Sequence, residues 1–159
     1  MEAMLYRVDG RLIHGQVIVS FTKTFHPEQI VVTNDSVAKD EFQKTLLEFA
    51  KPQNVDLLIL SIKDTAEAII NRRLSENTII VLKTVDDALG LIENGVHIKE
   101  INIGGMYHEP GKRQYAKALF ADEHDVNSIK KLKESGVSLY YQMAAQDVKE
   151  DVYHLLKIQ

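Results

Sequence analysis

One histidine of this sequence stands in a segment whose residue types suit phosphate chemistry. Asp9-Gly10-Arg11-Leu12-Ile13-His14-Gly15-Gln16 follows one apolar run and precedes another. The histidine therefore falls at an expected helix N-terminus, where free backbone N–H groups and the positive end of the helix dipole favour an anion. Gly15 allows close backbone approach, and Arg11 offers paired donors to phosphate oxygens. The segment predicts a cradle for a phosphorylated imidazole.

His14 suits a phosphoryl carrier because neutral imidazole is nucleophilic near physiological pH and forms a phosphoramidate that is reactive enough to transfer onward. The positive field that binds phosphate also disfavours the imidazolium and so helps to keep the ring neutral. Asp9 can hold Arg11 or orient the ring. The alternative is that a lone histidine beside glycine in a strand-to-helix loop is only a hydrogen-bonded loop residue.

Polar and small residues also follow several other predicted strands. In an open parallel sheet, ligands bind beyond the carboxyl ends of the strands. These positions hold Asn34 and Asp35, then Lys83 and Thr84, and then Gly104, Gly105 and Met106. We expect the first and last of these groups to form the rim of a site around the histidine. Paired glycines also occur in simple tight turns, which is the alternative for the last group.

The long irregular stretch 104–115 holds His108, and a loop of this length in a compact domain is often functional. The role of His108 is left open. The four histidines other than His14 and His108 are expected at the solvated surface.

Short apolar runs alternate with longer amphipathic stretches, a rhythm typical of parallel βαβ units. Strands are predicted near 4–8, 30–33, 55–60, 78–82, 99–103 and 137–142. Helices are expected in most of the gaps between them. We therefore predict an α/β fold, a single domain over residues 1–159 with an open, mainly parallel sheet and helices on both faces.

Helix patterns are well marked in this sequence. The stretch 38–50 places Phe42, Leu46 and Phe49 at helical spacing, so this helix is expected to cover the sheet. N-cap candidates with an acidic residue three positions later are Asp64, Thr84, Asp122 and Asp147.

Composition excludes several classes of function. A chain of 159 residues can bury a hydrophobic core without disulfides or bound metal ions. Its net charge of -4 and its scattered basic residues exclude nucleic acid as a partner. The absence of cysteine excludes disulfides and thiolate chemistry. No apolar run can span a bilayer and no signal-peptide pattern is present, so we expect a cytoplasmic protein that reaches a membrane only through a partner. Motifs for nucleoside triphosphates, dinucleotides and zinc are absent, so the phosphoryl group is expected from another phosphoprotein.

The segment from Arg7 to Gln16, Arg-Val-Asp-Gly-Arg-Leu-Ile-His-Gly-Gln, resembles the active-site signature of the IIB components of the mannose/fructose/sorbose family of the bacterial phosphoenolpyruvate-dependent sugar phosphotransferase system. Three further segments resemble the family in the same order: Val31-Val32-Thr33-Asn34-Asp35, Lys44-Thr45-Leu46-Leu47, and Ile101-Asn102-Ile103-Gly104-Gly105-Met106. The resemblance therefore covers essentially the whole chain. The sequence departs from the family pattern at Gln43, where relatives often carry arginine. The contact with an anion or a partner that is expected of the arginine is therefore left open for this chain.

The resemblance implies a phosphohistidine at His14, on Nδ1, with phosphate-contacting arginines at Arg7 and Arg11. It implies a sugar phosphotransferase that receives the phosphoryl group from a IIA phosphohistidine and delivers it to a sugar bound by IIC and IID membrane subunits. The protein would then lie at the inner face of the cell membrane, and relatives suggest a modest homo-oligomer. The sugar is left open among mannose, fructose, sorbose and amino sugars.

The expected mechanism is in-line transfer, with the two arginines and loop N–H groups stabilising the equatorial oxygens. No metal or diffusible cofactor is expected, because the phosphoramidate donor is already activated. Two alternatives stay open. The domain can sense a phosphorylated small molecule without being phosphorylated, or His14 can serve as the general base of an unrelated metabolic enzyme.

Overall fold

A seven-stranded sheet forms the centre of the computed structural model, which describes residues 3–159 apart from the side chains of Ala3, Gln16 and Val17. Its strands are β1 (Ala3–Asp9), β2 (Gln29–Thr33), β3 (Asp56–Leu60), β4 (Asn77–Leu82), β5 (Glu100–Gly105), β8 (Ser138–Tyr141) and β9 (Glu150–Asp151). Their order across the sheet is β3-β2-β4-β1-β5-β8-β9, and only β9 runs antiparallel to its neighbour. All six predicted strands are present, and the predicted fold class is confirmed.

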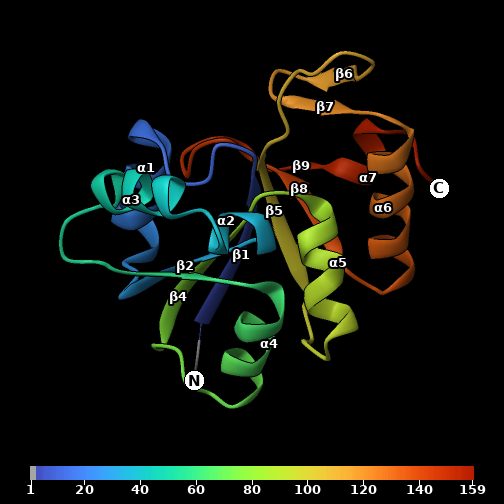
Figure 1. The fold of residues 1–159 in the computed structure, drawn as a ribbon. Coiled ribbons are helices and arrows are strands. Elements are labelled where there is room, and N and C mark those ends of the chain that lie inside the picture. Colours follow the sequence, from blue (N-terminus) through green and yellow to red (C-terminus); the bar gives the residue numbers. More distant parts are fainter. Residues whose placement is uncertain (1–2) are drawn as a thin grey trace.

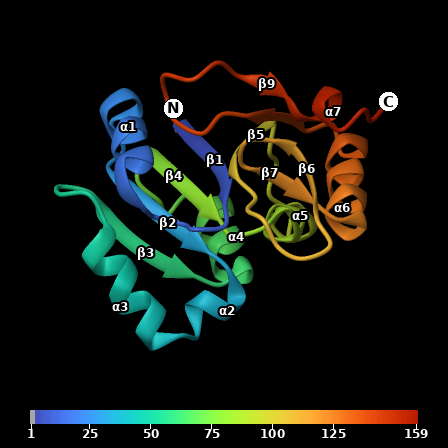
Figure 2. The same ribbon diagram turned by 90° about the horizontal axis from the view of Figure 1, so that it is seen from above.

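Helices cover both faces of this sheet (Figures 1 and 2). They are α1 (Gly15–Phe25), α2 (Asp35–Ala38), α3 (Glu41–Ala50), α4 (Ile62–Ile70), α5 (Val85–Glu93), α6 (Glu123–Glu134) and α7 (Val152–Leu155). Side chains alternate between the faces of a strand, so Ile79 and Val81 of β4 pack with α1, whereas Ile80 and Leu82 pack with α4, α5 and α6. Two apolar clusters therefore hold the sheet between them.

The two central strands, β1 and β4, send the chain in opposite directions. After β1 the chain passes through α1 to β2, on one side of the pair, and after β4 it passes through α5 to β5, on the other side. The loops at the carboxyl ends of β1 and β4 consequently diverge. This is the topological switch point at which open α/β sheets bind ligands.

A hairpin that the sequence did not predict projects beyond the carboxyl end of β5 (Figure 1). It consists of β6 (Arg113–Ala116) and β7 (Leu119–Ala121), within and just after the stretch predicted as irregular. The backbone of Met106 joins it to the sheet, with hydrogen bonds to Ala118 O and from Phe120 N, both 2.8 Å long. The strands are too short for their side-chain alternation to be recognised in the sequence.

The prediction for the stretch 38–50 is wrong in one respect. It forms the end of α2 and then α3, but Phe42, Leu46 and Phe49 are 75%, 52% and 84% exposed, and Leu47 is the buried residue of α3. Figure 2 shows the reason, because α3 lies at one end of the sheet beside the edge strand β3. Only a narrow strip of the helix therefore meets the core, and the three predicted core residues form an exposed apolar stripe.

Two of the four predicted helix caps are confirmed. Thr84 and Asp122 close capping boxes at the starts of α5 and α6. Asp64 is not a cap, because α4 begins one turn earlier, where Ser61 accepts a hydrogen bond from the Asp64 backbone N–H. Asp147 is not a cap either, because its segment leads into β9 and Asp151 caps α7. No helix within residues 3–159 is both long and apolar enough to cross a membrane.

Candidate active site

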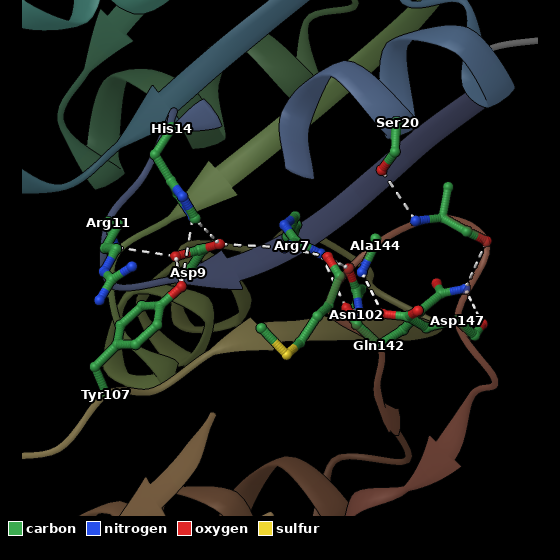
Figure 3. Close-up of polar contacts among 12 residues, drawn as sticks. Arg7, Asp9, Arg11, His14, Ser20, Asn102, Tyr107, Gln142, Ala144 and Asp147 are labelled. Atoms are coloured by element: carbon green, nitrogen blue, oxygen red, sulfur yellow. Dashed lines mark hydrogen bonds and ion pairs between the residues drawn. The ribbon is translucent and has the colours of Figure 1, made fainter. Parts of the chain in front are cut away.

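Asp9 is the centre of the hydrogen-bonded cluster at the carboxyl end of β1 (Figure 3). Its side chain is fully buried and accepts four hydrogen bonds. Oδ1 accepts from the Arg11 backbone N–H and the Tyr107 hydroxyl, both at 3.0 Å. Oδ2 accepts from the Arg7 guanidinium at 3.1 Å and faces His14 Nε2 at 3.0 Å. The carboxylate therefore connects four separate parts of the site.

The loop from Gly10 to His14 is anchored by its backbone and by its apolar residues. The Gly10 N–H donates to Gly105 O at 3.0 Å, and the Leu12 N–H donates back to Asp9 O at 2.9 Å. Leu12 takes a left-handed conformation with φ 62° and is buried together with Ile13. These contacts place the histidine backbone, which is extended, directly before the first residue of α1.

The His14 ring points at Asp9 and not at the helix that it precedes. It makes no capping hydrogen bond, and 27% of its side chain is exposed. The carboxylate accepts hydrogen bonds and cannot donate them, so the neutral ring carries its hydrogen on Nε2. The lone pair is then on Nδ1, which is the nitrogen available for attack on an electrophile. Asp9 therefore takes both of the roles open to it, because it faces the ring with Oδ2 and holds Arg11, through the backbone N–H, with Oδ1.

Arg7 lies behind this pair and is almost completely buried. Nη1 donates to Asn102 Oδ1 at 2.6 Å and to Gln142 O at 3.1 Å. Nη2 donates to Asp9 at 3.1 Å and to Met143 O at 2.7 Å. Burial lowers the pKa of Arg7, and the Asp9 charge opposes that shift. The structure thus uses Arg7 to hold Asp9, which differs from the expected phosphate contact because its terminal N–H groups all have protein acceptors.

Arg11, in contrast, is exposed at the mouth of the site. Its guanidinium carbon lies 4.3 Å from the centre of the Tyr107 ring. Within residues 3–159 it forms no ion pair, and Asp9 bonds to its backbone and not to its guanidinium. The Arg11 donors are therefore available to an anion.

The paired glycines lie in the last two positions of β5 and do not form a tight turn. A Cβ atom on Gly104 would overlap the Arg7 guanidinium, and a Cβ atom on Gly105 would overlap the Tyr107 phenol. The two glycines therefore leave the space that the side chains of Arg7 and Tyr107 occupy. Met106, which follows them, is buried and connects β5 to the hairpin.

The predicted rim residues after β2 brace the loops and do not reach the histidine. Asn34 caps α2 and donates to both carboxylate oxygens of Asp87, at 3.2 and 3.0 Å. Asp87 also accepts from the backbone N–H groups of Lys83 and Thr84. Asp35 accepts from the first backbone N–H of α4 at 2.8 Å. Asn34 ties the loop after β2 to the loop after β4, and Asp35 ties it to the loop after β3. Neither residue makes a described contact with the Asp9–His14 pair.

Gly15 and Gln16 begin α1, directly after the histidine. Gly15 is exposed and has φ 48°, a conformation that glycine adopts without strain. The side chain of Gln16 lies outside the part of the chain that the structure describes, so its predicted role stays a prediction.

A cavity of about 280 Å³ opens beside Arg11 and Tyr107 at the switch point between β1 and β4. His108 lines it and stacks edge-on against Phe120, with ring centres 5.4 Å apart. Lys112 also lines it and forms an ion pair with Asp125 at 3.0 Å. Among the described residues, no group of three histidine or carboxylate side chains could hold a metal ion.

Sequence reasoning missed Tyr107 and the acceptors that hold Arg7. Tyr107 directly follows the 104–106 segment that was selected, so its position after a strand was the available signal. The carbonyl groups of Gln142 and Met143 gave no signal in the sequence, because every residue carries a backbone carbonyl and these two residues lie far along the chain from Arg7.

Residues 3–159 match the family model described as PTS system sorbose subfamily IIB component. The chain belongs to this family. It is 34% identical to the fructose-specific EIIB component of Bacillus subtilis (strain 168), a match that covers 99% of this chain and 97% of that protein. The sorbose-specific EIIB component of Klebsiella pneumoniae is 35% identical, with 92% and 90% covered. The predicted family is therefore confirmed.

Solved structures agree with this assignment. The crystal structure of the IIBSor domain of the Klebsiella pneumoniae sorbose permease matches with a TM-score of 0.91 at 32% identity, covering 99% of this chain and 97% of that one. The mannose-specific EIIAB component of Escherichia coli (strain K12) is 34% identical and is matched over 47% of its length. IIB components are sugar phosphotransferases, so this chain is a sugar-specific component of a phosphotransferase system.

Proposed function

We propose that His14 carries the phosphoryl group, accepting it on Nδ1 from the phosphohistidine of a IIA protein. It then passes the group to a sugar held by IIC and IID membrane subunits. The observation that supports this most directly is the 3.0 Å contact between Asp9 and His14 Nε2, because it leaves the Nδ1 lone pair available. The name of the EIIAB relative, which joins an A and a B component, supports a IIA partner.

The accepting step needs no proton transfer on this side. The Nδ1 lone pair attacks phosphorus while the phosphorus–nitrogen bond of the donor breaks, and its electron pair returns to the donor nitrogen. The hydrogen on Nε2 stays in place throughout. As the new bond forms, positive charge develops on the ring, and the buried Asp9 carboxylate beside Nε2 stabilises it.

The phosphoryl oxygens meet positive groups at the mouth of the site. Arg11 supplies N–H donors that have no ion-pair partner within residues 3–159. The N–H groups in the first turn of α1 have no partner within the helix, because helices leave these groups unsatisfied, and the positive end of the helix dipole lies at the same place. Arg7 acts from behind, because it holds Asp9 and has no terminal donor left for phosphate.

Onward transfer reverses the bond changes. A hydroxyl oxygen of the sugar attacks phosphorus, the bond to Nδ1 breaks, its electron pair returns to Nδ1, and the hydroxyl proton passes to water. The Nε2–H tautomer held by Asp9 is regenerated without rearrangement. This step places the protein against the inner face of the cell membrane while it is bound to its IIC and IID partners.

Mass spectrometry tests the proposal. A matching IIA is first phosphorylated with phosphoenolpyruvate and the general phosphotransferase proteins, then purified and incubated with this protein in the presence of a chelator. We expect one added phosphoryl group that is labile in acid and stable in base. It should be absent from His14→Ala and retained in the control His108→Ala, which changes a histidine of the neighbouring cavity. An unmodified wild-type chain beside a verified phosphorylated IIA would overturn the proposal.

A further inference from the structure

Tyr107 contacts both members of the Asp9–His14 pair and also the free arginine of the site. We infer that Tyr107 is a positioning residue for phosphoryl transfer: its hydroxyl locks the Nε2–H tautomer of His14 through Asp9, and its ring holds Arg11 at the mouth of the site. The inference rests on the proposed phosphoryl-carrier function of His14, and it assigns to Tyr107 two separable contributions.

The hydroxyl selects the tautomer through its hydrogen-bond geometry. It donates to Asp9 Oδ1 at 3.0 Å, and its oxygen lies 3.4 Å from His14 Nε2. Because the phenol has one hydrogen and gives it to the carboxylate, a lone pair of the phenol oxygen is left for the Nε2–H group. A ring with its hydrogen on Nδ1 would instead turn a bare Nε2 towards two oxygen acceptors. The phenol and the carboxylate therefore disfavour the same wrong tautomer.

The hydroxyl also stays a donor. Burial raises the pKa of Tyr107, and the negative charge of Asp9 raises it further, so the phenol keeps its hydrogen near neutral pH. Without this donor, Asp9 Oδ1 would keep only the Arg11 backbone N–H. The carboxylate, still bound by Arg7 and by the Arg11 backbone, would then be fixed less firmly in the orientation that faces the imidazole.

The ring places Arg11 without cancelling its charge. A carboxylate partner would fix the guanidinium equally well, but it would occupy the donors that a phosphoryl group needs. An aromatic face attracts the cation through its quadrupole and leaves the N–H groups at the edge of the guanidinium open. The distance of 4.3 Å from the guanidinium carbon to the ring centre is within the range of this interaction.

Tyr107 is itself held by rigid elements. Gly105 in β5 leaves the volume that its phenol occupies, and a Cβ atom on Gly10 would come within 3.2 Å of ring atom Cδ2. The preceding residue, Met106, is hydrogen-bonded to the hairpin on both its N–H and its carbonyl. A side chain supported on several sides can transmit orientation to its partners.

The test compares Tyr107→Phe, which removes only the hydroxyl, with Tyr107→Ala, which also removes the ring. Tyr115→Phe is the matched control, because Arg113 lies over the Tyr115 ring at 5.4 Å and no described contact joins Tyr115 to the Asp9–His14 pair. Circular dichroism confirms folding of each variant. Nitrogen-15 NMR of the imidazole of unphosphorylated His14 then measures the tautomer ratio, and single-turnover phosphorylation by IIA measures the transfer rate.

We expect the wild type and Tyr115→Phe to show the Nε2–H tautomer, and Tyr107→Phe to show a mixture with a maximal rate that is lower by about tenfold. Tyr107→Ala should in addition need a higher IIA concentration for half-maximal rate, because Arg11 loses its support. An unchanged tautomer ratio in Tyr107→Phe overturns the inference even when the wild type is phosphorylated normally. Failure of the wild type to accept phosphate overturns the proposed function instead, and the two failures are distinguished in the same samples.

Discussion

His14 Nε2 and Asp9 Oδ2 are 3.0 Å apart, although the carboxylate is fully buried and the imidazole is partly exposed. One end of the ring thus faces a fixed charge inside the protein while the ring as a whole remains accessible to a partner. A phosphoryl carrier needs this combination, because the same ring must be oriented by the protein and be reached by a second molecule.

Replacement of Asp9 by asparagine should slow the phosphorylation of His14 by roughly a hundredfold or more, because an amide can donate to the ring and favours the wrong tautomer. Single-turnover transfer from phosphorylated IIA measures the rate. Asp122→Asn is the control, since asparagine caps helices as well as aspartate does and Asp122 caps α6, in another part of the molecule. Transfer by Asp9→Asn within twofold of wild type would contradict the assigned role of Asp9.

Replacement of Arg7 by methionine should lower the free energy of unfolding by about 3 kcal/mol, because it leaves the buried Asp9 without its counter-charge. Urea unfolding followed by circular dichroism measures the change. The exposed Arg73, changed to methionine, is the control, and there we expect less than about 0.5 kcal/mol. Equal losses in the two variants would show that Arg7 does not hold the site together.

Alanine at Gly104 and at Gly105 should have different effects, although both glycines are in β5. The new Cβ atom at Gly104 meets a guanidinium fixed by four hydrogen bonds, so we expect a stability loss of roughly 2–3 kcal/mol. At Gly105 it meets the phenol at the far end of the half-buried Tyr107 side chain, which would be displaced from its contacts with Asp9 and His14. The main loss there should be in transfer rate, with stability changed by less than about 1 kcal/mol. A reversed order of the two stability losses, measured in urea, would refute this account.

The sequence predicted the fold class and all six long parallel strands because apolar runs of strand length separated by capped helices are local signals. The face of α3 was predicted wrongly, because helical spacing shows that Phe42, Leu46 and Phe49 share a face but not whether the sheet extends far enough to cover it. In the site, His14 and Asp9 were found because they share one loop. The two carbonyl acceptors of Arg7, Gln142 O and Met143 O, were not found, because they are backbone atoms of a distant segment.

The exposed stripe on α3 and the buried Leu47 should differ in their contribution to stability. Leu47→Ala removes a buried side chain and should cost about 2–4 kcal/mol of unfolding free energy. Phe49→Ser changes a residue that is 84% exposed and should cost less than about 0.5 kcal/mol. Urea unfolding distinguishes the two. If Phe49→Ser proved as costly as Leu47→Ala, the helix would present the face that the sequence suggested.

A pair outside the Asp9–His14 cluster should make stability depend on pH. His124 Nε2 lies 2.6 Å from Asp86 Oδ2, and the hydrogen bond and charge of Asp86 raise the pKa of His124 above its ordinary 6.5. Burial alone would raise the pKa of Asp86 from 3.8, but hydrogen bonds from Ser128 and His124 lower it overall. The contribution of the pair is therefore complete between pH 3.8 and 6.5. It is lost as the pH rises through the raised pKa or falls through the lowered one.

His124→Gln should accordingly lower the urea midpoint at pH 5.5 and leave it unchanged at pH 9, where the histidine of the wild type is neutral. His154→Gln, on the exposed part of α7, is the control for a histidine without a described carboxylate partner. A pH-independent difference between wild type and His124→Gln would mean that the ion pair adds nothing to stability.

The connection of Arg7 to Gln142 and Met143 also determines when the site can form during synthesis of the chain. β1, which precedes His14, is made before its neighbours β4 and β5, which begin at Asn77 and Glu100, and the carbonyl groups that hold Arg7 come later still. Contacts between such distant segments form slowly, and domains of this kind fold as units. We therefore expect a nascent chain that ends before β8 to contain the full signature segment without a positioned histidine, so the site can form only after Gln142 and Met143 have been made.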